Sequence, residues 1–203
     1  GDHRDLHSFP TRRSSDLDAP TAGNILDAID ILKQAKETDT VLLFIAGHGA
    51  NDGSNYRFLA TNAERAGSTF RSATVVPWQF LQDAIETTKG RRILFIDTCH
   101  SGNAYNQQLG NAAYHANIIA YTSARFDQEA LEDSSLGHGL FTYAVVEGLD
   151  GKGAMATKRE ISTKELAEFV VKRVEQLAKT IKGQQEPQYF KGRDADDYVL
   201  ARW

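Results

Sequence analysis

Three short apolar runs, each followed by glycine or small polar residues, constrain the fold of this chain most strongly. The runs cover residues 41–46, 92–97 and 116–123, and the strand ends read Ala-Gly-His-Gly, Asp-Thr-Cys-His-Ser-Gly and Thr-Ser-Ala-Arg. A continuous apolar run of this length indicates a strand in a sheet that is covered on both faces. Because helical patterns alternate with these runs, the sequence predicts an α/β fold with a mostly parallel sheet and helices on both faces.

The helical patterns have one apolar side each. They cover residues 22–37, 76–90, 139–149 and 162–183, and two further short strands are predicted at 56–62 and 197–202. Thr21 or Asn24 is expected to cap the first helix. In parallel sheets ligands bind beyond the carboxyl ends of the strands. The polar residues after the three apolar runs are therefore expected to gather at one rim of the sheet.

Composition narrows the classes of function. The chain has 203 residues, 41% of them hydrophobic, and a net charge of −4, as expected for one globular domain. Lysine and arginine are scattered, which argues against a nucleic-acid partner. No run approaches the ~18 apolar residues that span a membrane. With one cysteine the chain forms no internal disulfide, which favours a cytoplasmic setting.

The first 17 residues differ from the rest. They are polar and aperiodic, and they match a translation of a widely used short-read sequencing adapter: ACACGACGCTCTTCCGATCT reads as residues 11–17. We therefore predict that residues 1–17 are an artefactual, disordered tail. Residues 18–203 are then expected to be a domain that starts inside a gene and lacks its true N-terminus.

The single cysteine, Cys99, follows the second apolar run and is the candidate nucleophile. Attack by a thiol on a carbonyl needs a nearby base, and the candidates beyond residue 17 are His48, His100, His115 and His138. His48 is favoured because it ends a predicted strand, as Cys99 does. His100 neighbours Cys99 and should point away, while His115 is assigned to a polar loop and His138 to a loop or helix cap.

The residues around this pair suggest further roles. The backbone amides of Gly49 and Cys99 are natural donors to an oxyanion, because glycine allows close approach of a substrate. Asp97 lies two residues before Cys99 and so shares its side of the strand. Its carboxylate is either a cap at the strand end or the floor of a pocket that selects Arg or Lys by charge-assisted hydrogen bonds.

The segments "FIAGHGAND" and "FIDTCHSGNA" resemble the His and Cys motifs of caspase-like cysteine peptidases, with His48 and Cys99 51 positions apart. The Asp-x-Cys-His-Ser-Gly pattern is closest to metacaspases and bacterial caspase-like proteins. Three later segments, "YTSARFDQEALED", "GHGLFTYAVVEGL" and "QEPQYF", also resemble this family. The resemblance covers residues 18–203 and implies a caspase-like three-layer sandwich.

The resemblance also implies roles for individual residues. His48 is the implied base, Cys99 the nucleophile and Asp97 a residue that recognises a basic side chain before the cut. Ser123, at the end of the next strand, is a weaker pocket candidate that a plain loop serine explains equally well. The implied partner is a protein or peptide substrate, and the full-length protein of such a family can be fused to interaction domains. No cofactor is expected, and activation by calcium is left open.

Two departures from the family pattern affect these expectations. Ala46 stands where metacaspases usually have a serine, which removes one hydrogen bond to substrate. The first two strands and a helix of the family, whose sheet order is 2-1-3-4-5-6, are missing, as is an acidic pocket residue that this region usually supplies. The strand at residues 41–46 is then an exposed apolar edge. Residues 18–203 alone are expected to fold poorly and to cleave weakly.

Other interpretations were weighed. A non-catalytic caspase-like signalling or scaffolding module is the main alternative, although such proteins generally lose the His or the Cys that this chain keeps. A phosphatase loop needs Arg six residues after the Cys, where this chain has Tyr105. A zinc site is disfavoured because Cys99 and His100 have no second close pair. Self-cleavage within residues 103–116 is not expected because they contain no Lys or Arg. Arg125 is a possible cleavage site, but no sequence feature requires cleavage there.

Overall fold

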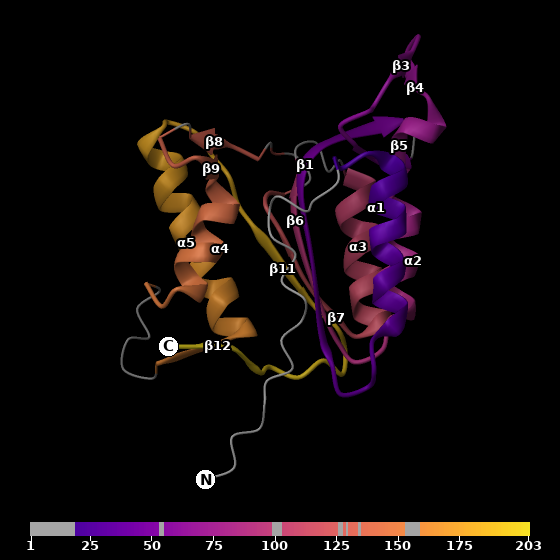
Figure 1. Ribbon diagram of the computed structural model, residues 1–203. Helices are drawn as coiled ribbons and strands as arrows, with labels where there is room; N and C mark the ends of the chain where they lie inside the picture. The colour runs from indigo at the N-terminus through magenta and orange to yellow at the C-terminus, as the bar shows by residue number, and fades with distance from the viewer. Residues whose placement is uncertain are drawn as a thin grey trace.

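The computed structural model describes residues 19–52, 55–98, 103–125, 128, 130–133, 135–152 and 159–203 (Figure 1). Its helices are α1 (Ala22–Ile29), η2 (Asp30–Gln34), η3 (Ser72–Thr74), α2 (Trp78–Thr87), α3 (Asn103–Ala116), α4 (Leu140–Leu149) and α5 (Thr163–Thr180). Its longer strands are β1 (Thr40–Asp52), β2 (Asn55–Leu59), β5 (Val75–Pro77), β6 (Arg91–Thr98), β7 (Ile118–Thr122), β11 (Gln188–Lys191) and β12 (Val199–Arg202). Shorter strands are β3 (Arg65–Ala66), β4 (Thr69–Phe70), β8 (Glu132–Asp133), β9 (His138–Gly139) and β10 (Glu160–Ser162).

The central sheet has six strands in the order β11-β7-β6-β1-β2-β5. The three central strands, β1, β6 and β7, are parallel, whereas β2, β5 and β11 are antiparallel to their neighbours. The carboxyl ends of the central strands therefore meet at one rim of the sheet, as the sequence predicts. The prediction of an α/β fold is confirmed.

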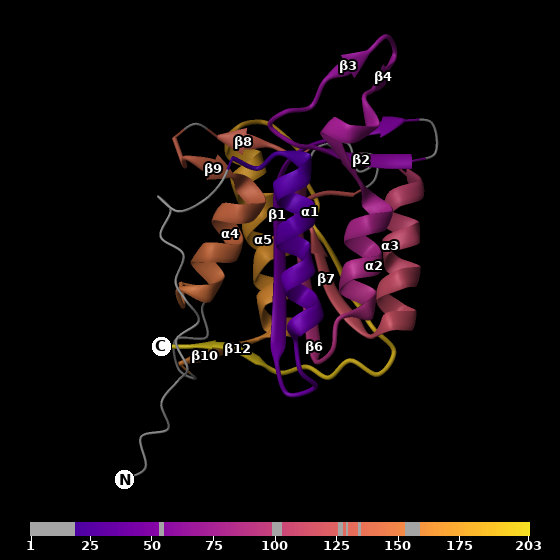
Figure 2. The same cartoon turned by 45° about the vertical axis from the view of Figure 1, so that its right-hand side comes forward.

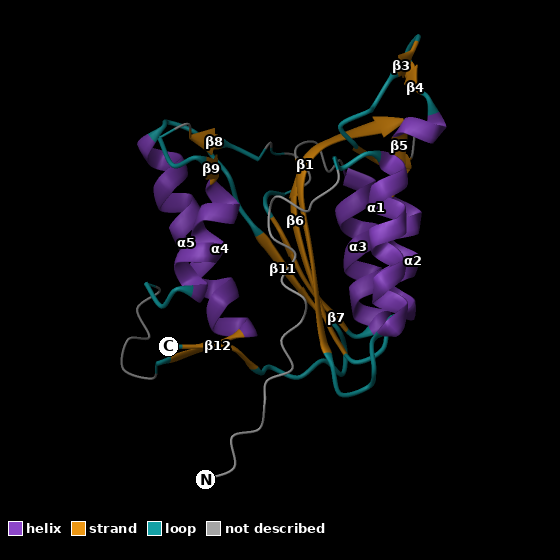
Figure 3. Cartoon of the chain, viewed as in Figure 1, coloured by secondary structure: helices purple, strands orange, loops and turns teal. Residues whose placement is uncertain are grey.

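Helices form a layer on each face of the sheet: α1, α2 and α3 cover one face, and α4 and α5 cover the other (Figure 3). Side chains of β6 alternate between the two faces of the sheet, so this strand contributes to both apolar cores. Leu94 and Ile96 join the first helix layer, and Ile93 and Phe95 join the second. All four are at most 2% exposed. This part of the sheet explains the continuous apolar run in the sequence.

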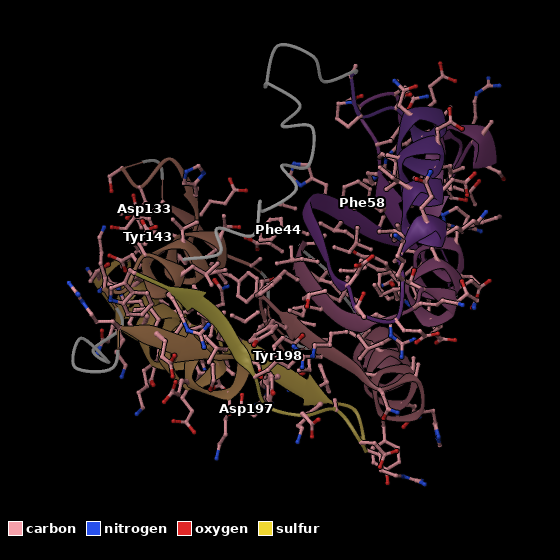
Figure 4. All side chains as sticks on the ribbon, turned by 60° about the horizontal axis from the view of Figure 1, so that its bottom comes forward. Phe44, Phe58, Asp133, Tyr143, Asp197 and Tyr198 are labelled. Atoms are coloured by element: carbon pink, nitrogen blue, oxygen red, sulfur yellow. The ribbon has the colours of Figure 1, made fainter. Side chains whose placement is uncertain are left out.

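Strand β1 is covered less completely. Val41, Leu43 and Ile45 pack toward the first core, but Leu42 is 49% exposed and Phe44 is 39% exposed (Phe44 is labelled in Figure 4). Among the described residues, the apolar core under α4 and α5 is built on β6 and β7, and Phe44 of β1 stacks on its Phe95 with 6.0 Å between the ring centroids. Over residues 40–47 the described part of the chain pairs β1 with β6 alone. The apolar strand edge expected from the sequence is therefore present.

An apolar groove runs beside this edge. Helix α1 lies alongside β1 in both views (Figures 1 and 2), and the space between them has a volume of about 390 Å³. Its lining includes Ile25, Ile29, Leu32, Phe44 and Phe58. An uncharged groove next to unpaired strand backbone is a surface at which another strand can add.

Helix α3 corrects one sequence interpretation. The sequence predicts a loop at residues 103–116, but these residues form a helix of 14 residues with His115 in its last turn. Its sequence mixes polar residues with alanine and tyrosine, and among its described side chains Leu109 and Ala113 lie in the buried core. Gly110 lies close to Phe190 of β11, where an added Cβ would come within 3.1 Å of the ring. Packing against the sheet, rather than a strong apolar pattern, stabilises this helix.

The remaining helices follow their predicted positions. Thr21 caps α1, and Ser162 and Glu165 form a reciprocal capping box at the start of α5. The predicted helix at 22–37 is shorter, because η2 replaces its second half. The predicted last strand is present as β12, but it pairs with β10 outside the central sheet. No helix among the described residues is long and apolar enough to span a membrane.

Candidate functional site

Strand β1 changes its partner at the residues that the sequence singled out. It pairs in parallel with β6 from Thr40↔Arg91 to Gly47↔Thr98, and from His48↔Leu59 onward it pairs with β2. His48 is therefore not the end of a strand, as the sequence suggested, but the first residue after β1 leaves β6. The residue itself is exposed at the rim, so its imidazole is open to solvent.

Gly47 permits this change of direction. Its φ of +147° lies in a region that residues with a side chain rarely adopt. A Cβ at this position would also come within 3.1 Å of the Phe58 ring. Phe58 comes from β2 and is labelled in Figure 4. Two separate constraints thus explain the glycine before His48.

Cys99 and His100 lie outside the described residues, which on this side stop at Thr98. The position of Thr98 is well defined by its neighbours. It pairs with Gly47, is 2% exposed, and accepts a hydrogen bond of 2.5 Å at Oγ1 from the phenol O–H of Tyr56. The residue before the candidate nucleophile is therefore anchored both by the sheet and by a side chain of β2.

Gly49 is buried next to the same tyrosine. A Cβ added at Gly49 would overlap the hydroxyl and the adjacent ring carbons of Tyr56, which is itself only 6% exposed. The sequence explained this glycine by close approach of a substrate. The structure adds a different reason, because the phenol of Tyr56 fills the space that a side chain would need.

Asp97 is buried, with 8% of its surface exposed, and it accepts two hydrogen bonds from Thr142 in the first turn of α4. The backbone N–H of Thr142 donates over 3.2 Å and its hydroxyl over 2.5 Å. Desolvation raises the pKa of Asp97, and the hydrogen bonds from Thr142 and Ser123 partly offset this effect. The carboxylate thus ties the end of β6 to the start of α4.

Ser123 lies beside Asp97, so the structure brings the two predicted pocket residues together. Ser123 is 1% exposed, and its hydroxyl donates to the Asp97 carboxylate. Its backbone is fixed on both sides: the N–H donates to the Ile96 carbonyl (2.9 Å), and the carbonyl accepts from Gln185 (2.7 Å). This serine is part of a buried polar network and not a plain loop residue.

The other candidate histidines lie elsewhere. His115 is exposed at the end of α3, where its ring contacts Tyr114 edge-on with 5.4 Å between the centroids. His138 lies in β9, opposite Asp133 of β8. It is next to Gly139, where an added Cβ would come within 2.9 Å of Asp97 Oδ2. The strand that holds His138 therefore also brings Gly139 next to Asp97, which its assignment as a loop or cap residue did not indicate.

Sequence reasoning did not identify Tyr56, Thr142 or Gln185. All three meet the predicted residues across long stretches of chain, at separations of 42, 45 and 62 residues. The Tyr56 position had one weak signal, a predicted strand directly after the Gly-His-Gly segment. Nothing in the local sequence indicates which way its side chain points.

Three comparisons place this geometry among known proteins. A family model described as caspase domain matches residues 6–198. No curated protein matches the chain. Among solved structures, the crystal structure of protein GSU0716 from Geobacter sulfurreducens is similar, with a TM-score of 0.52 and 16% identity. That alignment covers 86% of this chain and 74% of the other, and at this identity it supports the fold alone.

Proposed function

Because the chain belongs to the caspase-domain family, we propose that it is a cysteine endopeptidase that uses His48 as base and Cys99 as nucleophile. The observation that carries the proposal is the register of the central strands. Gly47 and Thr98 form the last pair of the parallel β1–β6 ladder, and His48 and Cys99 are the residues that directly follow this pair in the sequence. A His and a Cys in these positions are the parts that thiol attack on a peptide requires.

The proposed reaction has two halves. His48 takes the proton of the Cys99 thiol, and the thiolate attacks the scissile carbonyl while the amides of Gly49 and Cys99 donate to the oxyanion. The peptide C–N bond then breaks, and His48 returns the proton to the leaving amine. His48 then deprotonates a water molecule, which attacks the thioester. The C–S bond breaks, the carboxylate product is released, and the Cys99 thiol is regenerated.

The proposed preference is for Arg or Lys before the cleaved bond. Asp97 is a buried carboxylate whose hydrogen-bond donors among the described residues, Thr142 and Ser123, are neutral. A buried carboxylate without a counter-charge is costly, and a cationic substrate side chain supplies that charge. Binding of such a side chain is expected to lower the pKa of Asp97 and to favour its ionised form.

The decisive experiment measures cleavage of reporter peptides that end in Arg, Lys or Asp. Wild type is compared with Cys99→Ala, His48→Ala and Asp97→Asn, and His115→Ala serves as the matched control because it removes an exposed histidine from α3. We expect Cys99→Ala and His48→Ala to abolish cleavage, and Asp97→Asn to remove most of the preference for Arg and Lys.

The same assay contains the results that would contradict the proposal. Cleavage that survives Cys99→Ala refutes the nucleophile, and a wild-type preference for Asp refutes the role of Asp97. A folded wild-type chain that binds the peptides without cleaving any of them favours the non-catalytic signalling or scaffolding module instead.

A further inference from the structure

We infer that Tyr56 is a positioning residue that sets the relative placement of the two catalytic segments. This inference rests on the proposed function, since it concerns the segments that carry His48 and Cys99. Tyr56 belongs to neither segment: it lies on β2, opposite Asn51 in the β1–β2 ladder. Its side chain nevertheless contacts both.

The need for such a residue follows from the way in which β1 and β6 separate. Up to Gly47↔Thr98 the two strands are held at a fixed distance by their ladder of hydrogen bonds. From His48 onward β1 pairs with β2. The main-chain ladder therefore stops holding the two strands together at the last residue before the base and the last residue before the nucleophile.

Tyr56 bridges the strands at this point. Its hydroxyl donates to Thr98 Oγ1 over 2.5 Å, in a buried environment where both residues are at most 6% exposed. A hydrogen bond that is excluded from water holds its geometry more firmly than an exposed one. Through Thr98, which directly precedes Cys99, the bond fixes the end of β6 relative to β2.

Gly49 supplies the second contact. The phenol occupies the space beside Gly49 that a side chain would otherwise take, so the ring packs directly against the backbone that follows His48. One rigid ring thus touches the residue after the base and the residue before the nucleophile. A displacement of about 1 Å between reacting groups can cost about 100-fold in rate, so a link at this place matters for chemistry.

Tyr56→Phe tests the inference because it keeps the ring and removes the hydroxyl. The matched control is Tyr121→Phe, which removes another buried hydroxyl, one that donates to the Thr163 carbonyl over 2.6 Å and joins β7 to α5. Both variants lose one oxygen and one buried hydrogen bond. Urea unfolding of both measures the purely structural cost.

The single cysteine makes a readout possible that does not depend on cleavage. The rate of alkylation by iodoacetamide, followed from pH 5 to pH 10, reports the apparent pKa of Cys99 alone. His48→Ala gives the profile of a thiol without its base. We expect Tyr56→Phe to move the wild-type profile toward that of His48→Ala, and to lower kcat about 10-fold with little change in KM.

Two further variants sharpen the test. Thr98→Val removes the acceptor and should reproduce the effect of Tyr56→Phe, while the double variant should be no worse than either alone. Thr98→Ser keeps a hydroxyl and should restore the wild-type alkylation profile. Such rescue is not expected of a change that acts on packing alone.

The inference is overturned if Tyr56→Phe leaves both the alkylation profile and kcat as in wild type, or changes them no more than Tyr121→Phe does. Its failure can be separated from failure of the proposed function. One outcome is that wild type cleaves no peptide while His48→Ala still shifts the alkylation profile. In that case the inference about Tyr56 stands or falls with the alkylation profile of Tyr56→Phe alone. If His48→Ala shifts nothing, His48 does not act on Cys99, and the inference falls together with the base.

Discussion

At the scale of single residues, the buried carboxylate of Asp97 is the group whose surroundings affect its charge state most clearly. It lies where a strand ends and a helix begins, it is shielded from water, and it accepts from Thr142 at the start of α4. The two readings that the sequence left open, a cap and a pocket floor, are therefore not exclusive. A carboxylate has room for about four hydrogen bonds, so it can hold α4 and still receive a ligand.

Asp97 should also make stability depend on pH. Its folded-state pKa is raised above the ordinary 3.8, so its contribution is fully present below pH 3.8 and is lost as pH rises through the folded-state value. Asp97→Asn does not titrate. We expect the stability of Asp97→Asn relative to wild type to increase with pH in this window, by at most about 1.4 kcal/mol per pH unit, and then to level off.

Urea unfolding at pH 3 to 8 measures this difference. Asp133→Asn is the control for the sign of the effect, because hydrogen bonds from Ser135 lower the pKa of the partly buried Asp133. Its contribution is present above pH 3.8 and is lost as pH falls, so the relative stability of Asp133→Asn should change in the opposite direction. A wild type that gains stability over Asp97→Asn as pH rises would show that Asp97 is stabilised in its ionised form.

At the scale of elements, an ion pair adds to the apolar packing between α4 and α5. Arg173 donates to Glu147 with 2.5 Å between Nε and Oε2, and the two side chains are 30% and 11% exposed. The hydrogen bond lowers the pKa of Glu147 and raises that of Arg173, so both groups are stabilised in their charged forms. Partial burial makes such a pair stronger than a surface pair.

Glu147→Gln should destabilise the fold by about 1–2 kcal/mol at pH 7, after allowance for the part of the pair that solvent screens. Because the folded-state pKa of Glu147 is lowered from 4.5, this loss should shrink as pH falls below 4.5. Glu175→Gln is the matched control, since it breaks the exposed Lys179–Glu175 pair on the same helix. Equal effects of the two substitutions, measured by thermal or urea unfolding, would contradict the prediction.

The elements also show how far sequence patterns reach. The strong runs and amphipathic stretches predict β6, β7, α2, α4 and α5 close to their observed bounds, and they predict the start of β1. Helix α3 was missed because polar residues, alanines and tyrosines alternate in it without a strong apolar pattern, and packing on the sheet stabilises it. The end of β1 was misplaced because its last residues leave the apolar run and pair with β2, which depends on a partner and not on local composition.

At the scale of the whole molecule, the exposed edge of β1 is the surface that we expect to govern association between copies of the chain. Leu42 and Phe44 are largely open to solvent on a strand that pairs on one side over residues 40–47 in the described part of the chain. Flat, uncharged edges of this kind favour pairing between copies of a chain. Self-association is therefore expected to begin at β1.

Leu42→Lys should reduce this association at least several-fold at micromolar concentration, with little loss of stability because the side chain is 49% exposed. Val146→Lys is the matched control, since Val146 is 48% exposed on α4, outside the groove beside β1. Static light scattering and sedimentation velocity measure the effect. Equal reduction by both substitutions would mean that added charge alone, and not the β1 edge, governs association.

The sequence was enough to propose the reactive residues of the candidate site. It was not enough to identify the residues that hold them in position. His48, Gly49, Asp97 and Ser123 could be chosen because they lie at the ends of apolar runs, and parallel strands bring their carboxyl ends together at the edge where ligands bind. Tyr56 and Thr142 could not be chosen, because their roles depend on the register of β1 with β2 and on the placement of α4. Local sequence does not encode those distances.

Because β1 changes its partner at His48, the position of that change also determines where the fold tolerates insertions and deletions. Side chains alternate between the two faces of a strand, so one residue added or removed between Thr40 and Gly47 would turn His48 to the opposite face. The excursion from Ala60 to Thr74 carries no such constraint. Insertions and deletions among homologous chains should therefore fall in that excursion and spare the eight residues that precede the histidine.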